Sequence, residues 1–301
     1  MRSTVVMRTL WPAFVLSLAC GTHRNEPDGA PLPQAPVQPA SSPTSRRSPP
    51  AELMPADTAR RLSVATYNIN FGNGHLPETV ETIAALGTDI ILLQETTEAS
   101  ERAIRARLSG TYPEIRFEHC CRAGGLGVLS RFQILDAEVV SPDVGFFPAW
   151  WLRVDSPQGP LLVVDLHLRP PISDGGSWVV GFFSTRQVRA REIANLWLTI
   201  PKGEPTIVMG DFNEEAGGVL KFLGGEGFQD ALPQFAGSEP TWHWQVGAST
   251  LRMQLDHVAY SAAFKAVGAH VVSGGLSDHQ PVVVQLVRVP QSSVPAAGPG
   301  S

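Results

Sequence analysis

Short apolar runs constrain the fold of this chain more than any other feature of its sequence. Residues 89–94 and 161–167 read DIILLQ and LLVVDLH, and nearly continuous apolar runs of this length are typical of β-strands buried on both faces. Residues 77–86 and 98–108 read instead as helices. The remaining expected elements are a helix at 184–198, opened by a capping box at Ser184 and Gln187, and strands at 62–68, 127–130, 134–140, 150–154, 206–209, 254–260, 266–272 and 281–287. Strands mixed with helices in this way predict a layered α/β domain.

The N-terminal segment has the pattern of a targeting signal. Arg2 and Arg8 precede an apolar run at 10–19, which is about half of the ~20 residues that a bilayer-spanning helix needs. The run ends in LSLACG, which resembles the site at which bacterial lipoproteins are cut and acylated. We therefore expect residues 1–20 to be a lipoprotein-type signal peptide with Cys20 as the lipidated residue. The alternative is an ordinary signal peptide that is cut nearby.

Proline dominates the segment that follows. Nine prolines fall within residues 27–55, and such a sequence cannot bury enough apolar surface to fold. Residues 21–58 are therefore expected to be a disordered linker, residues 59–290 the folded domain, and residues 291–301 a flexible tail. Signal and linker together predict an exported protein of the cell envelope, anchored to a membrane by lipid.

Charge and cysteine content exclude some classes of function. The chain has 23 basic and 28 acidic residues, a formal net charge of −5, which argues against a strongly basic nucleic-acid-binding surface but leaves room for a local basic patch. The three cysteines, Cys20, Cys120 and Cys121, have no zinc-site spacing and form no disulfide framework. We expect Cys120 and Cys121 to be a reduced, partly buried pair used in packing. A redox pair and an intermolecular bridge are the alternatives.

Several expected strands end in, or are followed by, polar side chains that a buried strand does not otherwise carry. These side chains are Asn68, Glu95, His167, Asp211, Asn213, Asp256, Asp278 and His279. Each one alone is a weak signal, because polar residues after a strand usually belong to turns. Together they predict one polar cavity at the strand ends. Oxygen ligands with few histidines and no cysteine favour a hard cation, Mg²⁺ or Mn²⁺.

The order of these residues resembles the endonuclease/exonuclease/phosphatase superfamily, which includes deoxyribonuclease I-like nucleases, neutral sphingomyelinases and inositol-polyphosphate phosphatases. The matching motifs are TYNI (66–69), LLQE (92–95), GLGVLSR (125–131), VDLHL (164–168), GDFN (210–213), TW (241–242), LDHV (255–258) and SDH (277–279). The resemblance implies a four-layer α/β sandwich, in which two mixed β-sheets are flanked by helices and the site lies at the sheet ends.

The resemblance also implies roles for the residues around the metal and the water. Glu95 would be the principal metal ligand, supported by Asn68 and Asp278. Asp211 would orient or deprotonate the attacking water. Such a cation neutralises the charge that develops on the phosphoryl group, and the carboxylate places water in line with the leaving oxygen.

The phosphate contacts follow from the same resemblance. His279 would donate a hydrogen bond to the phosphoryl group, with Asp256 fixing its orientation. His167 would be a second catalytic imidazole, which protonates or stabilises the leaving group. The expected phosphate-binding residues are Asn68, Asn213, His167 and His279. The role of Asp165, on the same strand face as His167, is left open.

These roles predict divalent-metal-dependent hydrolysis of a phosphoester. We favour a nucleic-acid phosphodiester as the substrate, acted on by an exported monomeric nuclease. The alternatives are a phospholipid- or sphingomyelin-type phosphodiesterase, a phosphomonoesterase, and a non-catalytic binding module on the same fold. Because His167 is usually missing from the apurinic-site endonucleases of the superfamily, a base-excision-repair role is disfavoured.

Two aromatic segments bear on the substrate. Residues 145–151 read GFFPAWW and residues 176–183 read GSWVVGFF. Their alternate side chains either pack in the core, as in any half-buried strand, or form an apolar rim that contacts lipid or stacks on bases. We expect core packing to account for most of the first segment, which leads into a strand.

Overall fold

The structure of this protein is a computed structural model that describes residues 61–171, 181, 184–246 and 248–290. The expected signal peptide, linker and tail lie outside these residues, as does most of the aromatic segment at 176–183. The described residues form two six-stranded β-sheets, one two-stranded hairpin and five helices.

The first sheet contains the first and the last strand of the described chain. Its order is β13 (Phe264–Val271), β14 (Val282–Arg288), β1 (Arg61–Asn68), β2 (Ile90–Gln94), β4 (Leu126–Ser130) and β3 (Glu114–Glu118). The central strands β1 and β2 run parallel, with Asn68 paired to Gln94. The other neighbouring pairs in this sheet are antiparallel. The polar residues that end β1 and follow β2 therefore lie at the same edge.

The second sheet repeats this arrangement. Its order is β5 (Ile134–Val140), β6 (Ala149–Ser156), β7 (Gly159–His167), β8 (Thr206–Asp211), β12 (Asp256–Tyr260) and β9 (Gln229–Asp230). Strands β7 and β8 run parallel, with His167 paired to Asp211. Strand β12 runs antiparallel to β8, with Asp256 also opposite Asp211. The register alone brings these three side chains to one point of the sheet edge.

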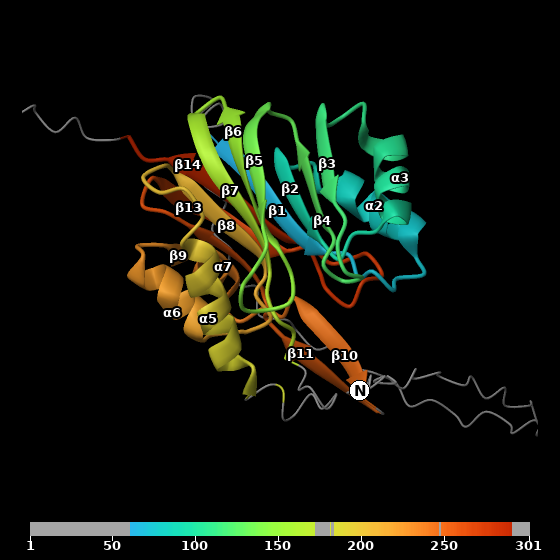
Figure 1. Ribbon diagram of the computed structural model, residues 1–301. Coiled ribbons are helices and arrows are strands. Elements are labelled where there is room, and N and C mark those ends of the chain that lie inside the picture. The colour runs from blue at the N-terminus through green and yellow to red at the C-terminus, as the bar shows by residue number, and fades with distance from the viewer. Residues whose placement is uncertain (1–60, 172–180, 182–183, 247, 291–301) are drawn as a thin grey trace, which may run out of the picture. The chain divides into compact units, whose positions relative to one another are not determined.

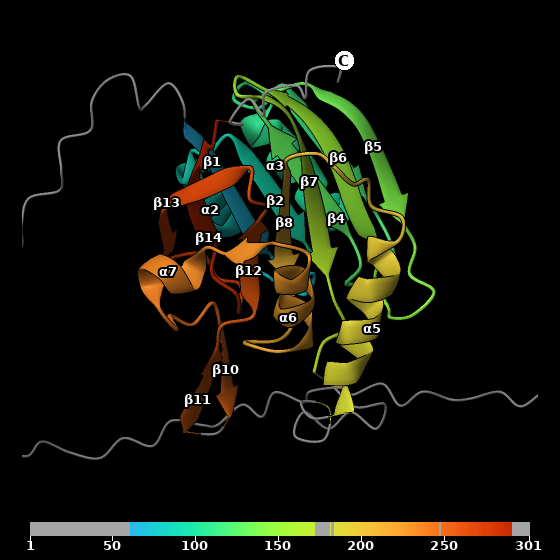
Figure 2. The same cartoon turned by 90° about the vertical axis from the view of Figure 1, so that its left-hand side faces the viewer.

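The sheets pack face to face and helices cover their outer faces, which confirms the expected four-layer sandwich of two mixed β-sheets (Figures 1 and 2). One apolar cluster, with Val64, Leu92, Val163 and Met209 among its members, fills the space between the sheets. Helices α2 (Leu76–Leu86) and α3 (Glu98–Leu108) cover the first sheet through a second cluster. Helices α5 (Arg186–Trp197) and α6 (Gly218–Gly225) cover the second sheet through a third.

Strand alternation explains why the polar residues meet between the sheets. On β1, Leu62 and Val64 belong to the cluster between the sheets, whereas Tyr67 belongs to the cluster under the helices. Successive side chains of a strand point to opposite faces, so Asn68 continues the inward row. The same alternation in β7, β8 and β12 puts three more polar side chains on the inward faces: His167, Asp211 and Asp256. The site is therefore the polar end of the inter-sheet core.

Local signals set the ends of the first two helices, and those of the first, Pro77 and Gly87, were expected. Helix α2 has Pro77 in its first turn and ends at Gly87, whose φ of 62° suits glycine. Helix α3 is capped by Thr97, whose side chain accepts a hydrogen bond from the backbone of Ser100. Capping of this kind satisfies backbone N–H groups that the first turn leaves free.

The capping box expected at the start of the third helix does not form. Helix α5 begins at Arg186, and its N-cap residue Thr185 makes no side-chain cap hydrogen bond. The Thr185 hydroxyl donates instead to the carbonyl of Gly181 and accepts from Arg189. The Thr185 hydroxyl therefore accepts from the buried side chain of Arg189 instead of from a backbone N–H of the first turn.

The sequence pattern did not reveal several short elements: β3, α6, β9, α7 (Leu232–Ala236) and the hairpin of β10 (Trp242–Val246) and β11 (Ser249–Met253). The hairpin projects away from the two sheets in both views (Figures 1 and 2). Its base is tied to the segment before β14, because the backbone of His243 donates to the carbonyl of Asp278 at 2.9 Å. A long-range contact of this kind leaves no periodic signal in the sequence.

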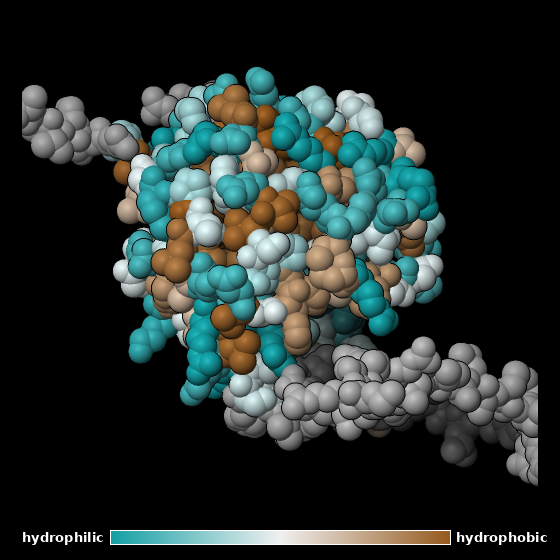
Figure 3. All heavy atoms as spheres, viewed as in Figure 1, coloured by the Kyte–Doolittle hydropathy of each residue, from teal (hydrophilic) through white to brown (hydrophobic). Residues whose placement is uncertain are grey.

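The face seen in Figure 3 carries several separate apolar patches between hydrophilic residues. Scattered patches are normal on soluble folds and do not by themselves mark an interaction surface. Of the helices in the described part of the chain, none combines the length and the apolar character needed to cross a bilayer.

Candidate active site

A cavity of about 190 Å³ lies at the ends of the central strands. Its wall includes six of the eight polar residues expected there: Glu95, His167, Asp211, Asn213, Asp278 and His279. The other two, Asn68 and Asp256, are buried and form hydrogen bonds to residues of the wall. The structure therefore brings together all eight residues, which come from both sheets and from loops between residues 68 and 279.

Two carboxylates on the wall are held by hydrogen bonds that fix their direction. Glu95 accepts from the side-chain nitrogen of Asn68 at 3.1 Å and from the backbone of Phe71 at 3.1 Å. Asp278 accepts from Asn70 Nδ2 at 2.8 Å and from Trp242 Nε1 at 3.0 Å. Burial, together with the charge of Asp278, raises the pKa of Glu95 despite these hydrogen bonds. A cation between the two carboxylates would offset that cost.

Asn68 bridges two carboxylates with its amide nitrogen. Its Nδ2 donates to Glu95 and, at 3.0 Å, to Asp211 Oδ2, while its Oδ1 accepts from the backbone of Asn70 at 3.0 Å. Only the oxygen of an amide can bind a cation. In this arrangement Asn68 aligns Glu95 and Asp211 rather than offering its oxygen to a metal, so its expected ligand role remains a prediction.

His279 is the centre of a buried chain of hydrogen bonds. Its Nδ1 lies 2.8 Å from Asp256 Oδ2, and the same oxygen accepts from the Thr241 hydroxyl at 2.6 Å. Its Nε2 lies 3.6 Å from Asp211 Oδ2. Burial alone would lower the pKa of His279, but the charges of Asp256 and Asp211 outweigh it and raise the pKa to about 10. The imidazolium is therefore the favoured form, with Nδ1 bound to Asp256 and Nε2 in an ion pair with Asp211 at a distance too long for a hydrogen bond.

Asp211 accepts two hydrogen bonds from its own turn. Asn213 donates to it through the backbone at 2.8 Å and through Nδ2 at 3.2 Å. Burial, helped by the charge of Asp256, raises the pKa of Asp211 to about 7. Asn213 Nδ2 also donates to the carbonyl of Leu168 at 2.9 Å. Both amide hydrogens of Asn213 thus have protein acceptors, and phosphate binding by this residue would require one to be released.

His167 is held as a specific tautomer. Its Nδ1 lies 3.0 Å from the carbonyl of Ala123, which can only accept, so Nδ1 carries the proton. The ring of Phe147 stacks on the imidazole with centroids 4.3 Å apart. Burial and the charge of His279 lower the pKa of His167 to about 3. Its Nε2 lies 3.6 Å from Asp211. A neutral His167 therefore presents a lone pair to the cavity, and an anionic phosphate would favour a second proton there.

Three residues of the site have backbone conformations that side chains rarely adopt. Asn70, Glu95 and Asn213 have φ values of 57°, 59° and 54°. Asparagine tolerates this left-handed region, but for glutamate it is uncommon. Strained residues of this kind gather at functional sites, where the surrounding fold must hold them. Gly210, next to Asp211, cannot be replaced by a residue with a side chain, because a Cβ atom there would collide with the carbonyl of Leu166 on the neighbouring strand.

Sequence reasoning assigned no role to several residues that shape the site. Asn70 and Trp242 both hold Asp278, and Gln94 donates from the first sheet to Asp165 in the second at 2.6 Å. Asp165 is wholly buried, and burial raises its pKa well above the usual value. Asn70 could have been found, because it lies two residues after Asn68. Nothing in the local pattern marks the Gln94–Asp165 contact between the sheets.

A buried carboxylate on α5 supports the wall beside His167. Glu192 accepts from the backbone of Arg169 at 3.0 Å and from the backbone of Phe146 at 3.4 Å. Burial raises its pKa to about 7 against the effects of those hydrogen bonds and the nearby arginines. A side chain at Gly145 would collide with this carboxylate. Glu192 thus fastens the segment that carries Phe147 to the helix layer.

The expectation of a reduced cysteine pair used in packing is wrong. Cys120 and Cys121 form a disulfide with each other, and both are exposed. The chain turns here with positive φ at Cys121 (32°) and Arg122 (63°), which brings the neighbouring sulfur atoms together. The same turn leads to Ala123, the partner of His167.

The aromatic segment at 145–151 is mostly core, as expected. Phe147, Trp150 and Trp151 are buried, whereas Phe146 is 52% exposed. The guanidinium of Arg169 lies 4.4 Å from the centroid of the Phe146 ring. Of these four aromatic residues, Phe146 alone is exposed enough to belong to an apolar rim that contacts the substrate.

Comparisons with known proteins agree with this geometry. Residues 65–279 match the model of the Endonuclease/Exonuclease/phosphatase family. A sequence comparison with curated proteins gave no match. Among solved structures, the chain is similar to D. rerio TDP2 complexed with a single-strand DNA product, with a TM-score of 0.61 and 16% identity over 75% of this chain and 98% of that chain. It is also similar to endonuclease/exonuclease/phosphatase proteins from Beutenbergia cavernae (TM-score 0.61, 21% identity, 76% and 72% covered) and Bacteroides thetaiotaomicron (0.60, 19%, 77% and 96%). At these identities the likeness demonstrates the fold.

Proposed function

Since the chain belongs to the endonuclease/exonuclease/phosphatase family, we propose that it hydrolyses a phosphodiester bond of nucleic acid with Mg²⁺ or Mn²⁺ as its cofactor. Phosphoester hydrolysis is the chemistry that the family and the fold support. The observation that carries the proposal is the single cavity in which Glu95, Asp211 and His279 meet, with Asp256 bound to His279. A carboxylate pair, a water-directing carboxylate and an oriented imidazolium are the groups that such a reaction requires.

The donor set fits a hard divalent cation. Glu95 and Asp278 line one cavity and supply carboxylate oxygens without any thiolate. The charge of Asp278 is among the causes of the raised pKa of Glu95, so the pair gains from a shared positive charge. These two residues would hold the ion, which when bound supplies charge neutralisation at a phosphoryl oxygen.

Asp211 and His279 perform the steps that this chain's own residues can supply. Asp211 is held by Asn68 and by its own turn, so its carboxylate is positioned to orient a water for in-line attack. His279 presents an Nε2–H to the cavity and would donate to a non-bridging phosphate oxygen, where negative charge grows in the transition state. Asp256 keeps that imidazole in place through Nδ1.

His167 would supply a second imidazole to the phosphoryl group. Its Nε2 faces the cavity because Nδ1 is committed to the carbonyl of Ala123. The approach of the anionic substrate would raise the pKa of His167, and a proton taken up from solvent at Nε2 would make it a donor to the phosphate or the leaving oxygen. Phe147 stacked on the ring prevents the imidazole from turning away.

Two arginine–aromatic pairs, which include or adjoin in sequence residues of the cavity wall, favour nucleic acid over the other phosphoesters. The guanidinium of Arg122 lies 5.6 Å from the centroid of Phe71, and that of Arg169 lies 4.4 Å from the centroid of Phe146. Aromatic rings beside arginines bind nucleic-acid strands by stacking and by phosphate contact. The solved TDP2 structure that resembles this chain holds a single-strand DNA product, which supports the same substrate class.

The cellular location is a proposal from the sequence. A lipoprotein-type signal at 1–20 with Cys20 acylated, followed by the proline-rich linker, would place the catalytic domain outside the cytoplasm at a membrane surface. We expect such an extracytoplasmic nuclease to act as a monomer.

The test is a substrate panel with the purified full-length protein and Mg²⁺. The panel compares a single-stranded oligonucleotide, a small soluble phosphodiester, a phosphomonoester and sphingomyelin vesicles. The Asp211→Asn variant is the inactive control. We expect cleavage of the oligonucleotide and a loss of at least about 10²-fold in the control. Preferential hydrolysis of the vesicles or of the monoester would contradict nucleic acid as the substrate and would assign the lipid or the monoester instead. Equal turnover by the control, or none by the wild type on any substrate, would contradict catalysis at this site.

A further inference from the structure

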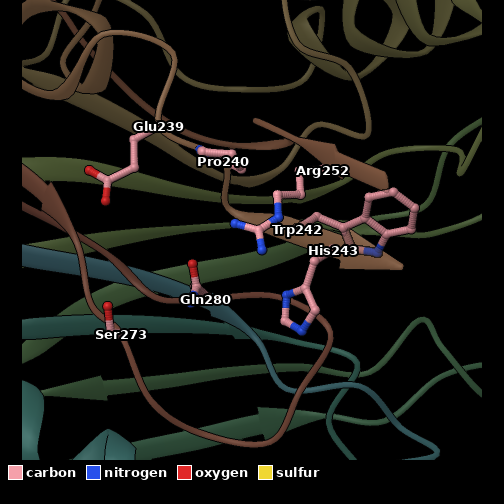
Figure 4. A pocket seen from close by; sticks show the side chains of 7 residues that line it. All are labelled: Glu239, Pro240, Trp242, His243, Arg252, Ser273 and Gln280. Carbon is pink, nitrogen blue, oxygen red and sulfur yellow. The ribbon is translucent and has the colours of Figure 1, made fainter. Parts of the chain in front are cut away.

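A second cavity, of about 350 Å³, lies beside the hairpin β10–β11 and is larger than the catalytic one. Its wall includes His243 and Arg252 from the hairpin, and Ser273 and Gln280 from the segment on either side of the catalytic Asp278 and His279 (Figure 4). No step of the proposed hydrolysis uses this cavity.

The cavity is lined by two nitrogen-bearing side chains on one face of the hairpin. His243 and Arg252 are cross-strand partners in the register of the two strands, and directly opposed residues project to the same side of a ribbon. In Figure 4 the imidazole and the guanidinium lie next to each other, with Gln280 beside them and Ser273 farther away on the same side as Gln280. Neighbouring donors of this kind match the oxygens of a phosphate group.

Arg252 has its charge available for a ligand. Within the described part of the chain, neither its guanidinium nor the His243 imidazole forms an ion pair or a side-chain hydrogen bond. Glu239 is the one carboxylate among the described residues of this wall, and it is paired with neither of them. The formal charges of Arg252 and Glu239 cancel in sum, but the guanidinium is not consumed by that carboxylate and can itself bind an anion.

The second cavity adjoins the catalytic one. Trp242 belongs to the walls of both, and its indole nitrogen donates to Asp278. The backbone of His243 donates to the carbonyl of Asp278 at 2.9 Å, and that of Gln280 donates to Thr241 at 2.7 Å. The two cavities are thus separated by one indole and one short stretch of backbone.

We propose that this second cavity binds a neighbouring phosphate of the nucleic-acid substrate through Arg252 and His243. This inference rests on the proposed function and narrows it. A nucleic-acid strand carries one phosphate per nucleotide, so a strand whose scissile phosphate lies in the catalytic cavity offers another on the far side of Trp242. A small diester or a phospholipid headgroup with a single phosphate cannot fill both cavities. The cavity therefore selects polymeric over single-phosphate substrates.

The experiment compares kcat and KM of the wild type, Arg252→Gln, Arg252→Lys and Lys265→Gln in full-length protein with Mg²⁺, over a series of salt concentrations. The substrates are a single-stranded oligonucleotide and a small diester with one phosphate. Lys265 is a matched control for the loss of one exposed charge. Lys265 pairs with Val287 on strand β14, and Arg61 pairs with the same residue from the other side. These residues lie at the end of the first sheet that is opposite to the edge carrying Asn68.

Arg252→Gln should raise the KM for the oligonucleotide by roughly 3–10-fold at low salt and leave kcat unchanged. It should lower the slope of log KM against log salt concentration by about 0.7, the value for one lost contact to a single strand. Arg252→Lys should keep most of the salt dependence of the wild type, because the positive charge is retained. Lys265→Gln should behave as the wild type, and the small diester should distinguish none of the four proteins.

Three outcomes would overturn the inference. An unchanged KM and salt slope in Arg252→Gln would exclude a phosphate contact while leaving the proposed function intact. Equal losses on the small diester and the oligonucleotide would mean that the hairpin only supports Asp278. A wild type that cleaves the small diester but no oligonucleotide would refute the proposed substrate and this subsite together.

Discussion

Glu192→Gln should make the protein more stable relative to wild type as the pH rises. Burial raises the pKa of the Glu192 carboxyl from 4.5 to about 7 in the folded protein. The folded state then binds a proton that the unfolded chain has released, so the wild type loses stability between pH 4.5 and about 7, and the loss is complete above that range. Glutamine does not titrate, and it keeps an oxygen that can accept from the backbone of Arg169.

The expected magnitude follows from the size of the pKa change. A rise from 4.5 to about 7 corresponds to about 3.4 kcal/mol at 1.36 kcal/mol per pH unit. Of this, about 2.5 kcal/mol falls between pH 5 and pH 8. The difference in unfolding free energy, variant minus wild type, should increase by that amount over this interval.

The assay is urea unfolding followed by tryptophan fluorescence at pH 5, 6, 7 and 8. EDTA is included throughout, because metal binding is itself dependent on pH. Glu98→Gln is the matched control, since the Glu98 side chain is 79% exposed and its removal should give a difference that changes little with pH. A difference between Glu192→Gln and wild type that stays constant within about 0.5 kcal/mol from pH 5 to 8 would refute the reasoning.

The remaining predictions concern the catalytic groups and the membrane anchor. Excess EDTA should abolish hydrolysis and added Mg²⁺ or Mn²⁺ should restore it, because Glu95 and Asp278 offer only oxygen donors; full activity in EDTA would contradict the cofactor assignment. His279→Ala should lower kcat by at least about 10³-fold with unchanged circular dichroism, and Asp256→Asn should lower it less because Asp256 acts through His279; similar turnover in His279→Ala and wild type would exclude the assigned role. Cys20→Ala should move the protein from the membrane fraction to the soluble fraction, as checked by fractionation of cells; unchanged fractionation would indicate an ordinary signal peptide or a different anchor.

Much of the fold and most of the candidate site could be predicted from the sequence. Apolar runs such as residues 89–94 and 161–167 are typical of buried strands, and their short length favours strands over helices, so their place in a layered α/β domain followed from local pattern. Alternation along a strand then determines which polar residues share the inward face, as it does for His167 and Asp211. The order of the motifs supplied the family, which the match over residues 65–279 confirmed.

The tertiary structure decided how those residues are held and which others join them. Asn68 reaches Asp211 across 143 positions of the chain, and the carbonyl of Ala123 selects the tautomer of His167 across 44. The cysteine pair, the burial of Glu192 and the hairpin that carries Arg252 were likewise decided by the folded chain. A local pattern reports the free energy of burying one segment, whereas hydrogen bonds, pKa values and cavities depend on which distant segments are brought within a few ångströms of each other.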